Sequence, residues 1–477
     1  MRMLGSLLLL ILSPTWILAQ QDPSDNGAHP KLSVQTEAQN IPSAPTPQNL
    51  QGGGTTAQTG ATQAGSTTPS PLGPALSLKD AEALAIKNNP QITVARLNAL
   101  ASRQVTREVR SNLWPTTVID LTAVDADPGS RITAGALNNP IVYQRAAAGT
   151  SVSQLITDFG HTRNLIASAN FTAKAEEQNA IATKEQILLA VDQAFYGALQ
   201  AHDLLLVAQQ TVNARQSVTD QIQALFNSKL KSQLDLSFAN VNLAQAKLLV
   251  LDAENNENAA LATLSMVLGY PRIQAFQLVE DTTPTTQPPA NVDDLISEAF
   301  SMRPEILSLD FQYRSAQKFQ AAQRDLLLPD IRALGVLGDT PVRNPIISNW
   351  YGAVGVNVEI PVFNGFLFTA RAREATLREQ AVQERLADLR NTIARDVRTS
   401  WLNANTAYQR LDVTQQLLNQ ANLALDLAQT RYQLGLSSIV ELSQAQLQQT
   451  QAEISGAQAG YDYRLALAIL RYQTTGI

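Results

Sequence analysis

The sequence predicts a mainly α-helical fold with a small β part, and three observations support this. The 477 residues form two similar halves, each half contains a very long helical tract, and each half carries a pair of β-like segments. Cysteine is absent, so disulfides, thiolate metal sites and thiol nucleophiles are excluded. The fold must therefore be held together by packing between long helices.

The internal repeat is marked by prolines. Pro90 and Pro304 lie 214 residues apart (304 − 90), and so do Pro115 and Pro329 (329 − 115). Further along, the spacing shortens to 206, as between Phe226 and Tyr432 (432 − 226). Because such a repeat is too long for a solenoid unit, it predicts two structural halves, residues 76–268 and 291–477, joined by a linker at 269–290.

The helical tracts are identified by what they lack. Residues 366–434 contain neither Gly nor Pro, residues 161–268 contain only Gly197, and strong helix formers dominate both. In the second tract a heptad seam steps by three and four, through Leu411, Thr414, Leu418, Ala421, Leu425, Ala428 and Tyr432. A helix over 366–434 would be about 100 Å long, so it needs partner helices along its whole length.

The β-like segments lie before each long tract. Residues 351–360 alternate between small or polar side chains and Val or Ile, which is typical of a strand with one apolar face. We expect partners at 331–338 and, in the first half, strands at 118–124 and 146–156. Loops would lie at 125–143 and 338–349.

These four segments have the length of membrane-crossing strands. Four strands cannot close a barrel and open sheet edges are not tolerated in lipid, so strands that span would have to be shared among several chains. Trp114, Trp350 and Tyr351 at strand ends suit either an aromatic belt or ordinary packing.

The N-terminal region predicts export. Arg2, an apolar run at 4–12 and small residues before Gln20 are typical of a signal peptide at 1–19, and the run is too short for the alternative of a retained membrane anchor. Residues 20–75 are rich in Pro, Gly, Thr, Gln and Ser and should form a disordered arm. No later stretch has 18 uninterrupted apolar residues.

Candidate chemistry is sparse. The formal charge is −6 and no basic face suited to nucleic acid stands out. The three histidines, His29, His161 and His202, are too far apart in sequence to form a metal pair on neighbouring helical turns. No nucleophile–base arrangement is evident, so we expect neither an enzyme nor a cofactor.

Two segments carry a family resemblance. Residues 431–445 (RYQLGLSSIVELSQA) resemble the tip turn, and residues 358–365 (VEIPVFNG) the strand-to-helix passage, of the TolC-like outer-membrane efflux proteins. The order of elements, repeated twice, is similar to that family from about Leu76 to the C-terminus.

The resemblance implies an architecture and a role. Three protomers would give four strands each to a twelve-stranded outer-membrane β-barrel, and their helices to a periplasmic α-barrel. The homotrimer would be a passive duct in the outer membrane of a diderm bacterium, surrounded by its lipid, working with a periplasmic adaptor and an inner-membrane transporter in efflux or type I secretion. The exported substrate is not indicated. The alternative, a soluble periplasmic coiled-coil adaptor or adhesive stalk, leaves the two strand pairs unexplained.

The resemblance also implies an adaptor-docking surface at the helix tips. The residues concerned are Gly435, Leu436, Ser437 and Ser438 in the second half, and Lys229, Leu230 and Lys231 in the first. Two of them depart from the family pattern, because Lys229 stands where the second half has Gly435, and Ser437 replaces an arginine.

An acidic aperture is the last implication of the resemblance. Glu441 and Asp235 match each other in the two halves and would form carboxylate rings in a trimer, while Gln444 stands uncharged at a second acidic position. Tyr432 would hydrogen-bond Asp235 and help to hold the tips shut. The alternative is that both carboxylates merely favour the first turns of their helices.

Overall fold

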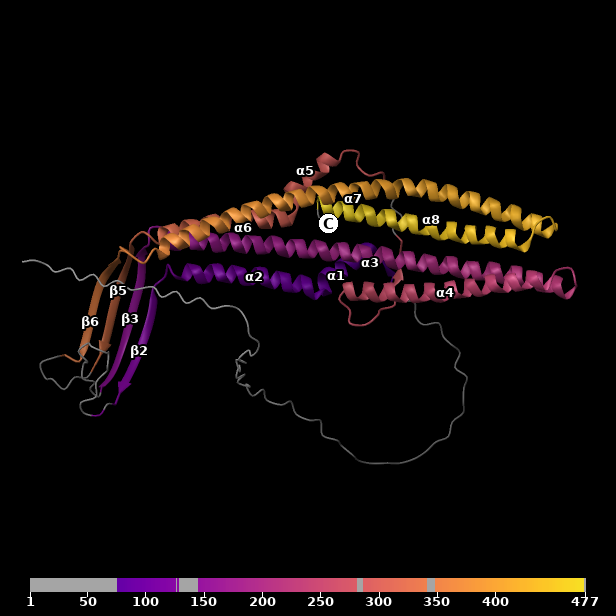
Figure 1. The fold of residues 1–477 in the computed structure, drawn as a ribbon. Helices are drawn as coiled ribbons and strands as arrows, with labels where there is room; N and C mark the ends of the chain where they lie inside the picture. The colour runs from indigo at the N-terminus through magenta and orange to yellow at the C-terminus, as the bar shows by residue number, and fades with distance from the viewer. Residues whose placement is uncertain (1–74, 126, 128–144, 281–285, 341–347, 476–477) are drawn as a thin grey trace, which may run out of the picture. The chain divides into compact units, whose positions relative to one another are not determined.

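The computed structural model confirms a mainly α-helical fold with a small β part (Figure 1). It describes residues 75–125, 127, 145–280, 286–340 and 348–475, which lie in one compact unit, Pro69–Ile477. The predicted signal peptide and the predicted arm, apart from Ala75, lie outside the described residues, as does most of each predicted loop.

The repeat takes the form of two copies of one order: two short helices, two strands and two long helices. The first copy comprises α1 (Leu78–Asn88), α2 (Pro90–Ser111), β2 (Thr116–Val124), β3 (Arg145–Thr157), α3 (His161–Asn227) and α4 (Gln233–Val267). The second comprises α5 (Val292–Met302), α6 (Pro304–Asp325), β5 (Asp330–Asp339), β6 (Trp350–Glu359), α7 (Leu367–Gln433) and α8 (Ile439–Thr474). Outside the two copies, β1 (Ala75–Leu76) pairs in parallel with β4 (Gln277–Leu278), which lies within the predicted linker.

The helices α3 and α7 are each 67 residues long, or about 100 Å. A turn at 228–232 divides the first helical tract into α3 and α4, and α7 returns as α8 in the same way. Along its length α3 packs against α2, α4, α6 and α8, and α7 packs against α6 and α8. The expectation that such helices need partners along their length is therefore met within one chain.

In each half a buried polar residue hydrogen-bonds to the end of the last helix. This residue stands at the start of α2 in the first half and at the start of α6 in the second. The Asn89 side-chain amide donates to the Val267 carbonyl at 2.9 Å, at the end of α4. In the second half Arg303 occupies the matching place and donates to Gln473 Oε1 at 2.5 Å, near the end of α8. Each half thus has a contact between the start of its second helix and the end of its last helix.

The four longer strands form one antiparallel sheet in the order β2-β3-β5-β6. The β3–β5 pairing joins the two halves. One face is apolar and exposed, with Leu121 and Val354 79 % and 92 % exposed. The register places Asp120, Asn357 and Glu359 on the opposite face. The predicted alternation is confirmed on β6, whereas on β5 Leu334 and Val336 lie on the same face as Asn357.

The three aromatic residues at strand ends have different surroundings. Trp114 and Trp350 are largely exposed and lie at opposite ends of the sheet. Tyr351 lies instead on the polar face, with its ring across Gly338 and Gly149, where a β-carbon at either glycine would collide with the phenol. Ordinary packing therefore explains Tyr351, because its ring fills the space that two glycines leave on neighbouring strands.

Candidate functional site at the two helix tips

The turn between α7 and α8 is a hydrogen-bonded helix C-terminus. Leu436 N–H donates to the Arg431 carbonyl at 2.8 Å and Gly435 N–H to the Tyr432 carbonyl at 3.1 Å. Gly435 has φ +71°, the left-handed conformation that this pattern requires. A glycine adopts it without steric cost, which explains the residue at this position.

The turn between α3 and α4 repeats this geometry without glycine. Leu230 N–H donates to the Leu225 carbonyl at 2.9 Å, and Lys229 N–H to the Phe226 carbonyl at 2.8 Å. Lys229 has φ +63°, so a residue with a β-carbon holds the left-handed position. The departure of Lys229 from the glycine pattern therefore leaves the shape of the turn unchanged.

The predicted aperture residues lie just after each turn. Ser232 caps α4, and the Asp235 carboxylate accepts hydrogen bonds from the Ser232 backbone N–H at 3.0 Å and hydroxyl at 2.7 Å. The Asp235 backbone N–H donates in return to the Ser232 hydroxyl oxygen at 3.2 Å, which completes a capping box that stabilises the start of the helix. The Asp235 carboxylate thus stabilises the first turn of α4, which is the alternative to an aperture role given in the sequence analysis.

Glu441 has a different environment. Its backbone N–H is capped by the Ser438 hydroxyl at 3.4 Å, but its carboxylate pairs with Arg431 across the turn at 3.2 Å. Both side chains are about half exposed, so the pair is screened by solvent and weak. Arg431 was not predicted as a site residue. Its place in the last turn of α7, opposite the first turn of α8, is the signal that would have found it.

The two tips are joined through an apolar cluster. Tyr432 and Leu442 of the second hairpin pack with Ile222, Leu236 and Ala239 of the first. The seam predicted from the heptad spacing therefore continues across to the other hairpin at this end.

Tyr432 lies in this cluster with its phenol oxygen buried. Among the described residues that oxygen has no partner at full hydrogen-bonding geometry, although the Asp235 carboxylate lies close enough to interact with it, so the hydrogen bond to Asp235 stays a prediction. Burial, with a contribution from the nearby Asp235 carboxylate, raises the pKa of Tyr432 to about 12. The ring contacts the half-buried Lys231, whose ammonium nitrogen lies 3.8 Å from the ring centroid. Lys231 was predicted only as a docking residue.

The remaining predicted residues are spread over the outer surface of the tips. Leu230 and Leu436 are 70 % and 67 % exposed. Gln444 is exposed on α8, whereas the Ser437 hydroxyl is buried and has no partner among the described residues. The structure thus gathers Asp235, Lys231 and Tyr432 and leaves the two tip leucines pointing outward.

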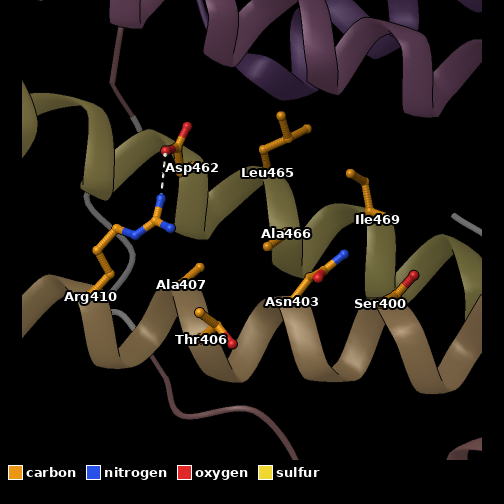
Figure 2. A pocket seen from close by; sticks show the side chains of 9 residues that line it. All are labelled: Ser400, Asn403, Thr406, Ala407, Arg410, Asp462, Leu465, Ala466 and Ile469. Atoms are coloured by element: carbon orange, nitrogen blue, oxygen red, sulfur yellow. Dashed lines mark ion pairs between the residues drawn. The ribbon is translucent and has the colours of Figure 1, made fainter.

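Other sites are few in the described part of the chain. A shallow depression of about 310 Å³ lies between α7 and α8, where Arg410 and Asp462 approach to 3.8 Å (Figure 2). No group of three or more His, Cys, Asp or Glu residues suited to a metal ion occurs among the described residues. None of the helices described there is both long and apolar enough to cross a membrane.

Comparison with known proteins extends these observations. The family model described as outer membrane efflux protein matches residues 83–270 and 295–474. The pyoverdine export outer membrane protein OpmQ of Pseudomonas aeruginosa is 24 % identical over 301 residues, which span 63 % of this chain and 63 % of OpmQ. Outer membrane protein TolC of Escherichia coli is 22 % identical over 340 residues, 68 % of each chain.

Solved structures show the same fold. CusC superposes with a TM-score of 0.74 at 17 % identity, covering 84 % of this chain and 92 % of CusC. The outer membrane protein VceC of Vibrio cholerae superposes with a TM-score of 0.73 at 15 % identity, covering 84 % and 96 %. Since the family model matches well over half of the 477 residues, this chain belongs to the outer membrane efflux protein family.

Proposed function

We propose that the protein is a homotrimeric outer-membrane duct of an efflux or secretion assembly. The observation that carries this is the four-stranded sheet, whose outer strands β2 and β6 each have one edge that no strand pairs with among the described residues. An unpaired edge in lipid leaves backbone N–H and C=O groups without partners, at a cost of several kcal/mol per group. Three copies joined edge to edge would pair every strand in a twelve-stranded barrel.

The two faces of the sheet suit this arrangement. Its apolar face carries Ile119, Leu121, Val354, Val356 and Val358, each more than half exposed in the single chain. Such a surface is unfavourable in water and favourable against lipid tails. The opposite face, with its charged residues, would line a water-filled interior. The soluble adaptor or stalk alternative gives no partner for the apolar face.

The long helices also support a trimer. On α4, Leu234, Val241, Leu248 and Leu251 lie along one side and are 52–63 % exposed. On α7, Val413, Leu417, Leu427 and Leu434 form a similar exposed row, 49–69 % exposed. Rows at this spacing are typical of coiled-coil seams that lack a partner. We infer that α4 of one protomer packs against α7 of the next.

The relatives guide the choice of partners and cargo. OpmQ is named for pyoverdine export and AprF of Pseudomonas aeruginosa for alkaline protease secretion, so relatives of similar identity carry a small molecule and a protein. The duct itself therefore does not indicate the substrate. The exposed tips with Leu230 and Leu436 are the surface that we propose for a periplasmic adaptor, which would connect the duct to an inner-membrane transporter.

A matched pair of substitutions on β6 tests the membrane placement. Val354→Arg puts a charge on the apolar face and should cost about 2–4 kcal/mol at the middle of the bilayer, so little protein should reach the outer membrane. Ala353→Arg, one residue away on the polar face, should be tolerated. The measurement is the amount of protein in purified outer membranes. Equal amounts for the two variants would contradict the assignment of faces.

The oligomeric state tests the closure of the barrel. Light scattering of the detergent-solubilised protein should give the mass of three chains, and the same sample should form conducting channels in planar bilayers. A monodisperse monomer that retains its strand content would rule out the shared barrel.

A further inference from the structure

We propose that the helix ends next to the sheet carry an arginine collar that binds anionic phospholipid in the periplasmic leaflet of the outer membrane. The collar consists of five exposed arginines, namely Arg110, Arg163, Arg324, Arg371 and Arg373. This inference rests on the proposed membrane placement of the sheet and adds the chemistry of the surrounding lipid.

The collar arginines share one level of the molecule. Arg110 and Arg324 lie in the last turns of α2 and α6, which lead into β2 and β5. Arg163, Arg371 and Arg373 lie in the first two turns of α3 and α7, which follow β3 and β6. All four of these helix ends adjoin the sheet (Figure 1). At 1.5 Å per residue, the five lie within about 10 Å of the ends of their helices.

None of the five takes part in an ion pair among the described residues. The carboxylates at the same level are mostly engaged elsewhere. Asp158 accepts from the Thr162 backbone N–H at 2.7 Å, Asp325 from the Asn164 amide at 2.7 Å, and Glu374 pairs with Arg378 at 2.6 Å. The five guanidinium groups are therefore exposed and free of ion pairs among the described residues, although Glu108, Asp158 and Asp325 keep their negative charge at the same level.

Helix stability explains only part of this pattern. A cation in the last turn of a helix interacts favourably with the helix dipole, which accounts for Arg110 and Arg324. The same dipole disfavours Arg163 in the first turn of α3, which has no acidic residue, whereas Arg371 and Arg373 lie beyond the first turn of α7, where the dipole does not favour a cation. Positive charge at both kinds of helix end indicates an anionic partner outside the chain.

The collar also continues the surface that we assign to lipid. Between it and the apolar strands lie exposed aromatic side chains at the chain passages, namely Trp114, Phe159, Phe363 and Phe366, each 53–77 % exposed. Aromatic residues favour the boundary between lipid tails and water, and long arginine side chains can reach from there to phosphate groups. Along the molecule the apolar strands come first, then the aromatic side chains, then the arginines. In a lipid leaflet the tails, the boundary with water and the phosphate groups follow in the same order. Attraction to an anionic surface is worth roughly five-fold in affinity per arginine.

The experiment measures which lipids stay with the protein. Trimers are reconstituted in bilayers of equal parts phosphatidylcholine and phosphatidylglycerol and extracted in mild detergent, and the retained phospholipid is quantified by mass spectrometry. The wild type should retain several-fold more phosphatidylglycerol than phosphatidylcholine, with less enrichment in high salt because screening weakens the attraction. Replacing all five collar arginines by glutamine should abolish the enrichment.

A matched pair on one helix provides the control. Arg371→Gln/Arg373→Gln removes two charges from the collar, and Arg385→Gln/Arg390→Gln removes two exposed charges further along α7, away from the sheet. The first pair should lower the enrichment and the second should leave it unchanged. An equal loss of phosphatidylglycerol enrichment in both double variants would overturn the collar. So would enrichment that remains after all five arginines are replaced. Failure of the wild type to insert into any bilayer would instead refute the proposed function.

Discussion

Lys229 and Gly435 hold the same left-handed backbone position in the two tips, although only one of them is glycine. For a residue with a β-carbon this conformation costs about 1–2 kcal/mol. We therefore expect Lys229→Gly to stabilise the first tip by about 1 kcal/mol. Gly435→Val should strain the second tip and reduce export while membrane insertion stays normal. Thermal unfolding of the trimer and an export assay measure the two effects. A stabilised Gly435→Val variant would contradict the proposed strain.

The aperture residues allow a second prediction at this scale. Glu441 is half exposed and only weakly paired with Arg431, so in a trimer its carboxylate would still attract cations. In planar bilayers Glu441→Ala should reduce cation preference and block by divalent cations. Gln444→Ala, which removes no charge, is the control. Unchanged selectivity and block in Glu441→Ala would place that side chain away from the constriction.

Tyr432 completes this prediction. Its phenol oxygen is buried near the Asp235 carboxylate, so Tyr432→Phe removes the predicted hydrogen bond and keeps the ring contact with Lys231. If the predicted hydrogen bond to Asp235 forms in the closed trimer, its loss should raise conductance. An unchanged conductance would show that the contact with Lys231, rather than the hydroxyl, holds the hairpins together.

At the scale of elements, the contact between α1 and α3 contains an acidic residue that packing does not explain. Asp192 of α3 is 4 % exposed, and its Oδ1 has no partner among the described residues. Burial, together with Glu82 of α1, raises the pKa of Asp192 to about 7, although Arg471 of α8 opposes the shift. Deprotonation near neutral pH therefore places a second negative charge beside Glu82 between the two helices, which Arg471 offsets only in part.

The sign of the pH dependence follows from the raised pKa. The folded state holds a proton on Asp192 that the unfolded chain releases at lower pH, so stability falls as pH rises from about 4 through about 7. Asp192→Asn should remove this loss and make the protein more stable than wild type at about pH 8, with little difference at about pH 4. Asp220→Asn, an exposed site on the same helix, is the control. A similar melting temperature for Asp192→Asn and wild type at about pH 8 would contradict the prediction.

At the scale of the whole molecule, the repeat organises both the fold and the site. Each half supplies two strands, a long helix and a returning helix, and the sheet joins the halves through β3 and β5. The sheet and the helix tips therefore lie at opposite ends of the long helices, so one chain would present its lipid-facing surface and its aperture about 100 Å apart (Figure 1).

The sequence by itself determined the repeat, the long helices and the two strand pairs. These depend on local properties: a helix former at nearly every position of 366–434, and strict alternation in 351–360. The family resemblance placed the tip turn at Gly435, and the structure shows the left-handed conformation there. Periodicity and turn chemistry act between residues that are close in the chain, so one sequence suffices to detect them.

Only the tertiary structure decided which distant groups meet. Lys231 and Tyr432 come from different halves, and their contact depends on how one hairpin packs against the other. The same long-range packing explains why the Tyr432 hydroxyl and Asp192 are buried. It also places Tyr351 across Gly338. Such contacts are set by the register between helices or strands far apart in the chain. A shift by one heptad or one strand residue would replace them without changing any local pattern.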